Sequence, residues 1–194
     1  MAHLPQLYLA SQSPRRAALL QQIGVDFEVV SVTVDETMLA TETPEHCARR
    51  LATEKARAGW RALDPERRRP VLGADTLVIA ADTVMGKPAD RQQAIEMLQT
   101  LSGTTHEVVT AVALATDQES VCSQRSRVTF RTLSRQECAA YWDSGEACDK
   151  AGGYAIQGLA AMFITRLDGS YSGVMGLPLY ETTELLKTFG IVVL

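Results

Sequence analysis

Short apolar runs alternate along the chain with segments whose apolar residues recur at helical spacing. The apolar runs predict strands over residues 6–10, 27–32, 71–80, 106–116 and 120–133. Helical segments lie between several of these runs, so strands and helices interleave. That order is typical of an α/β fold built on a mixed sheet.

Polar residues that precede the helical segments give each helix a start. The expected N-caps, which accept backbone hydrogen bonds, are Ser13, Thr43, Asp90 and Ser134. Pro14 and Pro44 follow two of these caps, and Glu137 completes a capping box with Ser134. The helices are expected to run from Pro14 to a stop at Gly24, from Pro44 to about Ala62, from Asp90 to Leu101 before Gly103, onward from Ser134, and onward from about Pro178.

Polar and glycine-containing stretches predict the connections. Residues 35–43 are expected to form a loop, 64–70 a charged surface turn, and 82–88 a break after the third strand. Residues 117–119 are expected to join two long strands as an antiparallel hairpin, and Asp168-Gly169 to form a turn between strands. With no repeat or linker, we predict one domain over residues 1–194.

Composition narrows the class of protein. The net charge of −4 disfavours a protein that coats nucleic acid or an anionic membrane. Neither the histidines (His3, His46 and His106) nor the cysteines (Cys47, Cys122, Cys138 and Cys148) have zinc-ligand spacing, which favours free thiols in a reducing compartment. Because the chain shows no basic leader and no apolar run that could span a bilayer, we predict a cytoplasmic protein without nucleic-acid or membrane partners.

The stretch LASQSPRR contains the first group of candidate chemical residues. Arg15 and Arg16 fall in a first helical turn, where the helix dipole disfavours cations. Backbone N–H groups, the hydroxyls of Ser11 and Ser13 and these guanidiniums are together suited to bind a phosphate. The alternative is two solvated surface arginines.

Asp75 is the second candidate, because acids are uncommon inside an apolar strand. A carboxylate at a strand end can accept a proton from water or hold a metal, although it can also simply cap a bend. Lys55, Lys87 and Glu36 are either ligands or ordinary surface residues. In the glycine-rich stretch DKAGGYAIQG, with Lys150 at its start, the Gln157 amide can donate to and accept from a base edge.

Taken in order, these segments resemble the Maf family of nucleoside triphosphate pyrophosphatases. The resemblance covers nearly the whole chain, from LASQSPRR through VDET, RLATEKA, VLGADTLV, GKP, LSGTTHEVVTAVAL, VTFRTLS and DKAGGYAIQG to GSYSGVMGLPLYET. GADT together with DKAGGYAIQG is most similar to the branch that acts on dTTP and UTP. Gln12 departs from the family pattern, because relatives often carry a small residue there; such a side chain is tolerable if it points outward.

The resemblance implies hydrolysis between the α and β phosphates, giving the nucleoside monophosphate and pyrophosphate, with modified pyrimidine triphosphates as further substrates kept out of nucleic acids. It implies an elongated mixed sheet flanked by helices with a deep cleft between two lobes, similar to inosine triphosphatases. Residue by residue, it implies that Asp75 accepts the proton and that Arg15, Thr76 and Gln157 select the nucleotide. Ser11, Arg16, Glu36, Lys55 and Lys87 match other positions of the cleft. Because a triphosphate brings several negative charges into one cleft, we expect Ser11, Arg16, Lys55 and Lys87 to bind phosphate and Glu36 with Asp75 to hold a divalent cation, Mg²⁺ or Mn²⁺.

Two other functions stay open at this point. The same cleft can serve 7-methyl-GTP or another purine triphosphate. Alternatively, because the family is associated with arrest of septum formation and cell division, the protein can be a nucleotide-sensing binding protein. The sequence also leaves the oligomeric state open, with a homodimer as one candidate.

Overall fold

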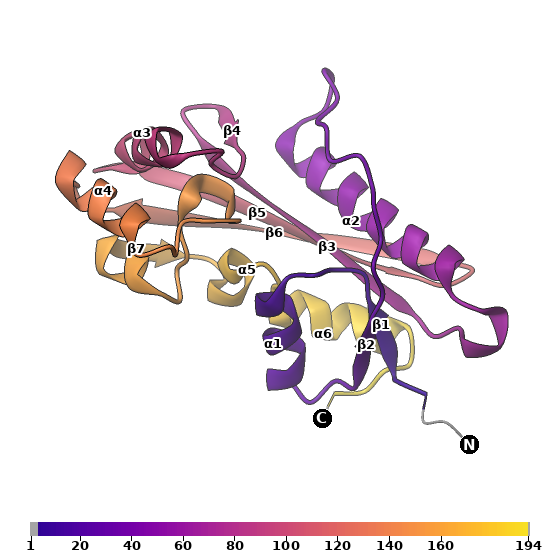
Figure 1. Ribbon diagram of the computed structural model, residues 1–194. Helices are drawn as coiled ribbons and strands as arrows, with labels where there is room; N and C mark the ends of the chain where they lie inside the picture. Colours follow the sequence, from indigo (N-terminus) through magenta and orange to yellow (C-terminus); the bar gives the residue numbers. More distant parts are fainter. Residues whose placement is uncertain (1–3, 194) are drawn as a thin grey trace. The chain divides into compact units, whose positions relative to one another are not determined.

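Strands β1 (Leu7–Leu9), β2 (Phe27–Val29) and β3 (Val71–Ala80) form the parallel part of a mixed sheet in the computed structural model, which describes residues 4–193 (Figure 1). The other strands are β4 (Thr83–Met85), β5 (Thr105–Ala115), β6 (Glu119–Phe130) and β7 (Ile164–Asp168). Within the described residues they form one seven-stranded sheet in the order β2-β1-β3-β5-β6-β7, with β4 antiparallel to β3 and β7 antiparallel to β6. The prediction of an α/β fold with a mixed sheet is confirmed.

The chain packs as two compact units. Unit 1 comprises Met1–Asp75, Thr110–Gln124 and Gly176–Leu194, and unit 2 comprises Thr76–Val109 and Arg125–Met175. Three of the four boundaries fall inside β3, β5 and β6, so these three long strands contribute residues to both units, and the fourth lies between Met175 and Gly176. The single-domain organisation stays a prediction, and each unit is described in its own right.

Unit 1 carries helices α1 (Pro14–Gln22), α2 (Pro44–Ala62) and α6 (Leu179–Thr188). Figure 1 shows α2 on one side of the unit 1 strands and α1 with α6 on the other. The predicted caps are confirmed, because the Ser13 hydroxyl accepts from the Arg16 N–H and the Thr43 hydroxyl from the His46 N–H. Local hydrogen bonds therefore fix where these helices begin.

Two glycines let α2 lie directly on the sheet. A Cβ atom at Gly73 of β3 would lie 2.6 Å from the Ala56 backbone nitrogen of α2. A Cβ atom at Gly59 of α2 would lie 2.7 Å from a methyl of Val71. Real Cβ atoms do not approach other atoms this closely, so a side chain at either position would not fit between α2 and β3. The helix and the strand can therefore pack more closely than side chains would allow.

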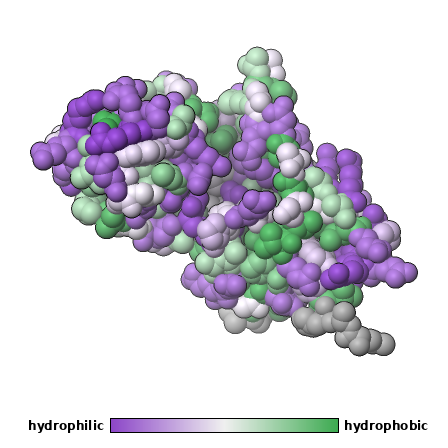
Figure 2. All heavy atoms as spheres, viewed as in Figure 1, coloured by the Kyte–Doolittle hydropathy of each residue, from purple (hydrophilic) through white to green (hydrophobic). Residues whose placement is uncertain are grey.

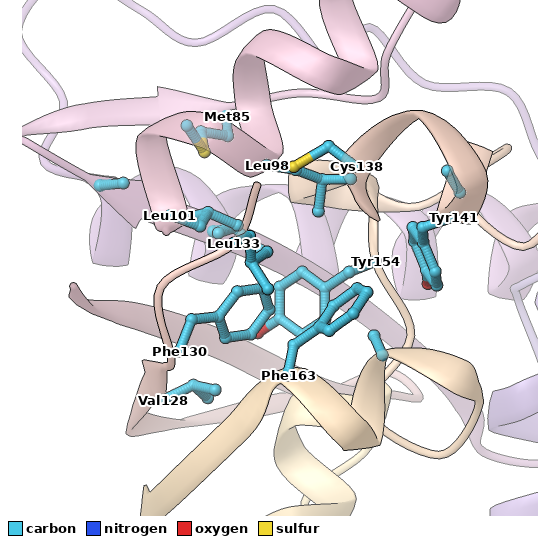
Figure 3. Close-up of a cluster of buried hydrophobic side chains, with 14 of the residues drawn as sticks. Met85, Leu98, Leu101, Val128, Phe130, Leu133, Cys138, Tyr141, Tyr154 and Phe163 are labelled. Carbon is cyan, nitrogen blue, oxygen red and sulfur yellow. The ribbon is translucent and has the colours of Figure 1, made fainter. Parts of the chain in front are cut away.

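Unit 2 packs around an aromatic and aliphatic core. Helix α3 (Arg91–Leu101) contacts α4 (Arg135–Asp143) and the short 3₁₀ helix η2 (Ala151–Gly153). Phe130, Tyr154 and Phe163 meet edge-on or tilted in the middle of this core, as Figure 3 shows. Edge-to-face contacts of this kind add to the area that the rings bury. Asp90 caps α3 and Ser134 with Glu137 forms the expected capping box on α4.

Several expectations about local structure need correction. Residues 83–85, within the expected break, form β4, which pairs with β3 across a two-residue turn at Ala81 and Asp82. Gly169 does not join two strands, because the Ser170 hydroxyl caps the next segment and starts helix α5 (Tyr171–Met175). Strand β2 ends at Val29 and β6 at Phe130, so both stop earlier than the expected 27–32 and 120–133. The surface turn at 64–70 contains a 3₁₀ helix, η1 (Pro65–Arg67).

The surface in view is mostly polar. Figure 2 shows hydrophilic side chains over most of that face, interrupted by smaller hydrophobic areas. Across residues 4–193, no helix has the length and apolar character needed to cross a membrane.

Candidate functional site

The N-terminus of α1 orients the side chain of Arg16. Its Nη1 donates to Ser11 Oγ at 3.1 Å and its Nε donates to the Gly176 carbonyl at 2.8 Å. The Ser13 N–H also donates to Ser11 Oγ, at 3.3 Å. Ser11 and Arg16, both expected phosphate ligands, are thus joined, and the half-buried Arg16 is not simply a solvated surface arginine. Gln12 is exposed and contacts Ser31, so it points outward.

Charges around Arg16 connect it to the two candidate carboxylates. Burial lowers the pKa of Arg16, while Asp75 and Glu36 raise it and Arg15 lowers it further. Because these effects act through space, both carboxylates lie within electrostatic reach of the guanidinium. Arg16 remains a cation in this setting, since the guanidinium keeps its proton in proteins.

Lys55 bridges Asp75 and Glu36. Its Nζ lies 2.7 Å from Asp75 Oδ1 and 2.5 Å from Glu36 Oε1. The Lys55 and Asp75 side chains are nearly buried, whereas that of Glu36 is about half exposed. The other oxygen of Asp75, Oδ2, is buried and has no hydrogen-bond partner. A buried carboxylate oxygen that lacks a partner is costly, so it suggests a position that a substrate or ion completes.

The close contact between α2 and β3 explains this pairing. Gly73 precedes Asp75 by two residues on β3, and Ala56 follows Lys55 directly on α2. Where the backbones touch at Gly73, the Lys55 side chain has only a short distance to cover to reach Asp75. The loop that carries Glu36 is held to the same helix by Arg50.

Arg50 is a residue that the sequence reasoning missed. It donates to both carboxylate oxygens of Glu42, at 2.5 and 2.9 Å, and to the Thr37 carbonyl at 3.0 Å. The hydrogen bond from Arg50 lowers the pKa of Glu42 to about 2, so this ion pair persists at neutral pH. An Arg and Glu on either side of a helix start is too common a pattern to indicate this role. Gly176, the acceptor for Arg16, was likewise given no role.

Arg15 lies in α1 of unit 1 and is half-buried, whereas unit 2 carries the expected site residues Thr76, Lys87 and Gln157. Thr76 follows Asp75 in β3 and is half-buried, and Lys87 is exposed in the segment after β4. The Gly86 carbonyl next to Lys87 accepts from the Gly152 N–H at 3.0 Å, so the segment that carries Lys87 lies against the glycine-rich loop. Gln157 of that loop is exposed, and Lys150 at its start donates to the Cys148 carbonyl. The structure therefore joins the Lys87 segment to the loop that carries Gln157.

Metal-binding side chains are sparse. Across the residues that the structure describes, no group of three or more His, Cys, Asp and Glu residues is arranged to hold a metal. The described cysteines are free thiols, as expected, and His3 lies outside the described residues. A cation bound near Lys55 would thus have two protein carboxylates at most as ligands, those of Asp75 and Glu36.

Comparisons with known proteins agree with these observations. The model of the family described as Maf-like protein matches residues 6–189. A dTTP/UTP pyrophosphatase from Alkalilimnicola ehrlichii is 55% identical over 190 residues, which are 96% of this chain and 94% of the relative. A dTTP/UTP pyrophosphatase from Pseudoalteromonas atlantica is 51% identical over 183 residues, 93% of this chain and 95% of the relative.

Likeness to solved structures is weaker. A dITP/XTP pyrophosphatase from Mycobacterium abscessus aligns with 66% of this chain and 74% of its own length, with 23% identity and a TM-score of 0.41. That score is too low to support an argument, so similarity to inosine triphosphatases stays a prediction.

Proposed function

Because this chain belongs to the Maf-like protein family, we propose that it is a nucleoside triphosphate pyrophosphatase that hydrolyses dTTP and UTP. Two relatives that match more than nine-tenths of the chain carry that name. The observation that carries the proposal is Asp75, whose Oδ1 is held by Lys55 while its buried Oδ2 has no partner. One carboxylate oxygen is therefore left to accept a proton from water, as a general base must.

The proposed reaction uses Asp75 to accept a proton from the attacking water. The water oxygen bonds to the α-phosphorus, the bond from that phosphorus to the α–β bridging oxygen breaks, and pyrophosphate leaves. Lys55, whose Nζ lies 2.7 Å from Asp75 Oδ1, holds the carboxylate in place. Catalysis then depends mainly on positioning and charge, as is usual for phosphoryl groups.

Ser11, Arg16 and Lys87 are proposed to bind the phosphates, together with Lys55. Arg16 is suited to this role because its contacts to Ser11 and to the Gly176 carbonyl hold the guanidinium in one orientation. A guanidinium that is already oriented loses less conformational entropy when it binds phosphate oxygens. The exposed Lys87 adds a charge that moves more freely.

A divalent cation, Mg²⁺ or Mn²⁺, fits the residues present. Mg²⁺ is usually held by one or two protein carboxylates together with substrate phosphates and water. Glu36 and the unpartnered Oδ2 of Asp75 provide such oxygens. When bound, the cation would neutralise phosphate charge and make the α-phosphorus more electrophilic. We assign proton acceptance to Asp75 and a shared part in holding the cation to both carboxylates.

We propose that Arg15, Thr76 and Gln157 select the nucleotide. The exposed Gln157 amide can both donate and accept, which matches the edge of uracil or thymine. We further propose that the enzyme works in the cytoplasm, where reducing conditions suit its free thiols.

Pyrophosphate release from a panel of pyrimidine and purine triphosphates, with and without Mg²⁺, tests this function. The wild-type protein should favour dTTP and UTP, and Asp75→Asn should lower kcat by about 10²- to 10⁴-fold, as for loss of a general base. Asp143→Asn is the control, because Asp143 is an exposed acid paired with Arg91. Undiminished release by Asp75→Asn would overturn the assignment of Asp75, and a preference for purines would overturn the assignment of substrate.

A further inference from the structure

Gln157 lies at the exposed corner of a tight turn whose other residues are mostly buried. The Gly158 N–H donates to the Ala155 carbonyl at 3.1 Å, which closes a turn with Ile156 and Gln157 in the middle. Ala155 and Ile156 are buried, whereas Gln157 is exposed. The backbone of the turn is therefore set by packing, while the Gln157 side chain is presented to a ligand.

Tyr141 and Glu146 hold both ends of this turn. The Ala155 N–H donates to the Tyr141 hydroxyl at 3.1 Å, and that hydroxyl donates to Glu146 Oε1 at 2.7 Å. On the other side, Glu146 Oε2 accepts from the Leu159 N–H at 2.9 Å, and Oε1 from the Ala160 N–H at 3.3 Å. Tyr141 is fixed in turn by the unit 2 core, where its ring packs edge-on against Phe163 (Figure 3).

Gly158 leaves the space that the Glu146 carboxylate occupies. A Cβ atom at Gly158 would collide with the carboxyl group of Glu146. The φ angle of Gly158 is −112°, outside the left-handed region that favours glycine. The close approach of Glu146 is therefore the observed reason for a glycine at this position.

The charge state of Glu146 suits this contact. Burial raises the pKa of the Glu146 carboxyl, but hydrogen bonds from Leu159, Tyr141 and Ala160 lower it by more, so the pKa lies below its usual value. At neutral pH the group is a carboxylate that only accepts hydrogen bonds. It therefore matches the two N–H groups and the hydroxyl that point at it.

We propose that Glu146 and Tyr141 are positioning residues for base selection, which hold the turn that presents Gln157 in the one geometry that reads the base. This inference rests on the proposed function, in which Gln157 contacts the base. Neither residue touches the substrate in this proposal. Their effect is on how well Gln157 discriminates, and not on the hydrolytic step at Asp75.

The experiment compares two variants that disturb the contacts of Glu146 with a matched control. We call the two, Glu146→Gln and Gly158→Ala, the clamp variants. Glu146→Gln leaves at least one N–H group facing an amide NH₂ group, and Gly158→Ala displaces the carboxylate without removing its charge. Glu137→Gln is the control. Glu137 lies in α4 of unit 2 and, like Glu146, accepts hydrogen bonds from a backbone N–H group (Ser134) and from a side chain (Arg131). The readouts are kcat and KM for dTTP and dGTP, and amide hydrogen exchange over residues 155–160 without nucleotide.

In both clamp variants we expect KM for dTTP to rise about tenfold, as for loss of a charged hydrogen bond, with kcat changed by less than about twofold. The preference for dTTP over dGTP should shrink by a similar factor, and exchange at 155, 159 and 160 should accelerate. Combining Glu146→Gln with Tyr141→Phe should add little, because both act on one network. Glu137→Gln should lose stability but keep the wild-type preference.

The outcomes separate the inference from the function on which it rests. Wild-type preference in Glu146→Gln, or an equal loss of preference in Glu137→Gln, overturns the positioning role while leaving the proposed function intact. A wild-type protein that does not favour dTTP or UTP overturns the proposed function, and the base-selecting role of Glu146 falls with it. In that case accelerated exchange in Glu146→Gln would still report a structural clamp, but not a selective one.

Discussion

Substituting Gly73 by alanine tests whether the direct contact between α2 and β3 sets the geometry of Lys55 and Asp75. The new methyl carbon would lie 2.6 Å from the Ala56 nitrogen and 3.1 Å from the Ala56 Cβ, and it would also collide with the Ala52 carbonyl. An ordinary contact begins at 3.4 Å, so α2 has to move away by at least about 0.8 Å to clear the Ala56 nitrogen, and by more to clear the nearer Ala52 carbonyl. These two nearest atoms belong to helix backbone, which cannot rotate aside.

The expected cost is about 1–3 kcal/mol of unfolding free energy, the usual range for overpacking a well-filled interior. Urea denaturation followed by circular dichroism measures it. Because Lys55 moves with α2, kcat should fall as well, while far-ultraviolet dichroism of the folded variant stays close to that of the wild type. The two losses should appear together, since one displacement causes both.

Gly59→Ala is the matched control on the other side of the same contact. Its methyl group meets side-chain carbons of Val71, Val30 and Ala10 at 2.7 to 3.3 Å and none of the three is a backbone atom, and alanine improves helix propensity by up to about 1 kcal/mol. Gly59→Ala should therefore destabilise the protein much less than Gly73→Ala. If the two variants unfold at the same urea concentration, or if Gly73→Ala retains full activity, the direct contact does not set the site.

Two further predictions concern the buried His106 and the two arginines of α1. Burial lowers the pKa of His106 to about 4, below the value of 6.5 in the unfolded chain. The folded state therefore binds fewer protons than the unfolded state, and about 3 kcal/mol of unfolding free energy is lost as the pH falls from 6.5 through 4. His106→Gln should flatten that part of the curve of unfolding free energy against pH, and an unchanged slope would exclude His106 as its source. Arg15→Ala should change the ranking of triphosphates in kcat/KM, whereas Arg16→Ala should lower all values alike because Arg16 is held in place by Ser11 and Gly176. Equal effects of the two substitutions on the ranking would contradict this division of roles.

Local signals predicted local structure well. The caps at Ser13, Thr43, Asp90 and Ser134 were readable because each depends on a hydrogen bond within three residues. The β3–β4 hairpin was missed because its turn lacks the usual glycine or asparagine. Ala81 and Asp82 adopt positive φ angles of 47° and 60° there, which the sequence does not suggest.

The candidate site was only partly predictable. The resemblance predicted Lys55, Asp75 and Glu36 as site residues. The distances from Lys55 to the two carboxylates depend on how α2 packs on β3, which no spacing in the sequence encodes. The roles of the Gly176 carbonyl and of Glu146 depend on contacts with residues far along the chain or in an irregular loop. Hydrogen bonds to backbone atoms leave little trace in residue type, so such contacts appear only in the structure.

The Lys55 ammonium group, which we propose to bind phosphate, already has an anionic partner in the Glu36 carboxylate. Asp75 is buried and keeps its contact with Lys55, whereas Glu36 is half exposed on an irregular loop. In the function proposed above, where Lys55 binds phosphate, an arriving phosphate would compete with this internal anion, and the half-exposed Glu36 is the partner that would leave at the smaller cost in free energy. Substrate affinity would then be the difference between two ion pairs, and the exchange would release the Glu36 carboxylate when a triphosphate enters.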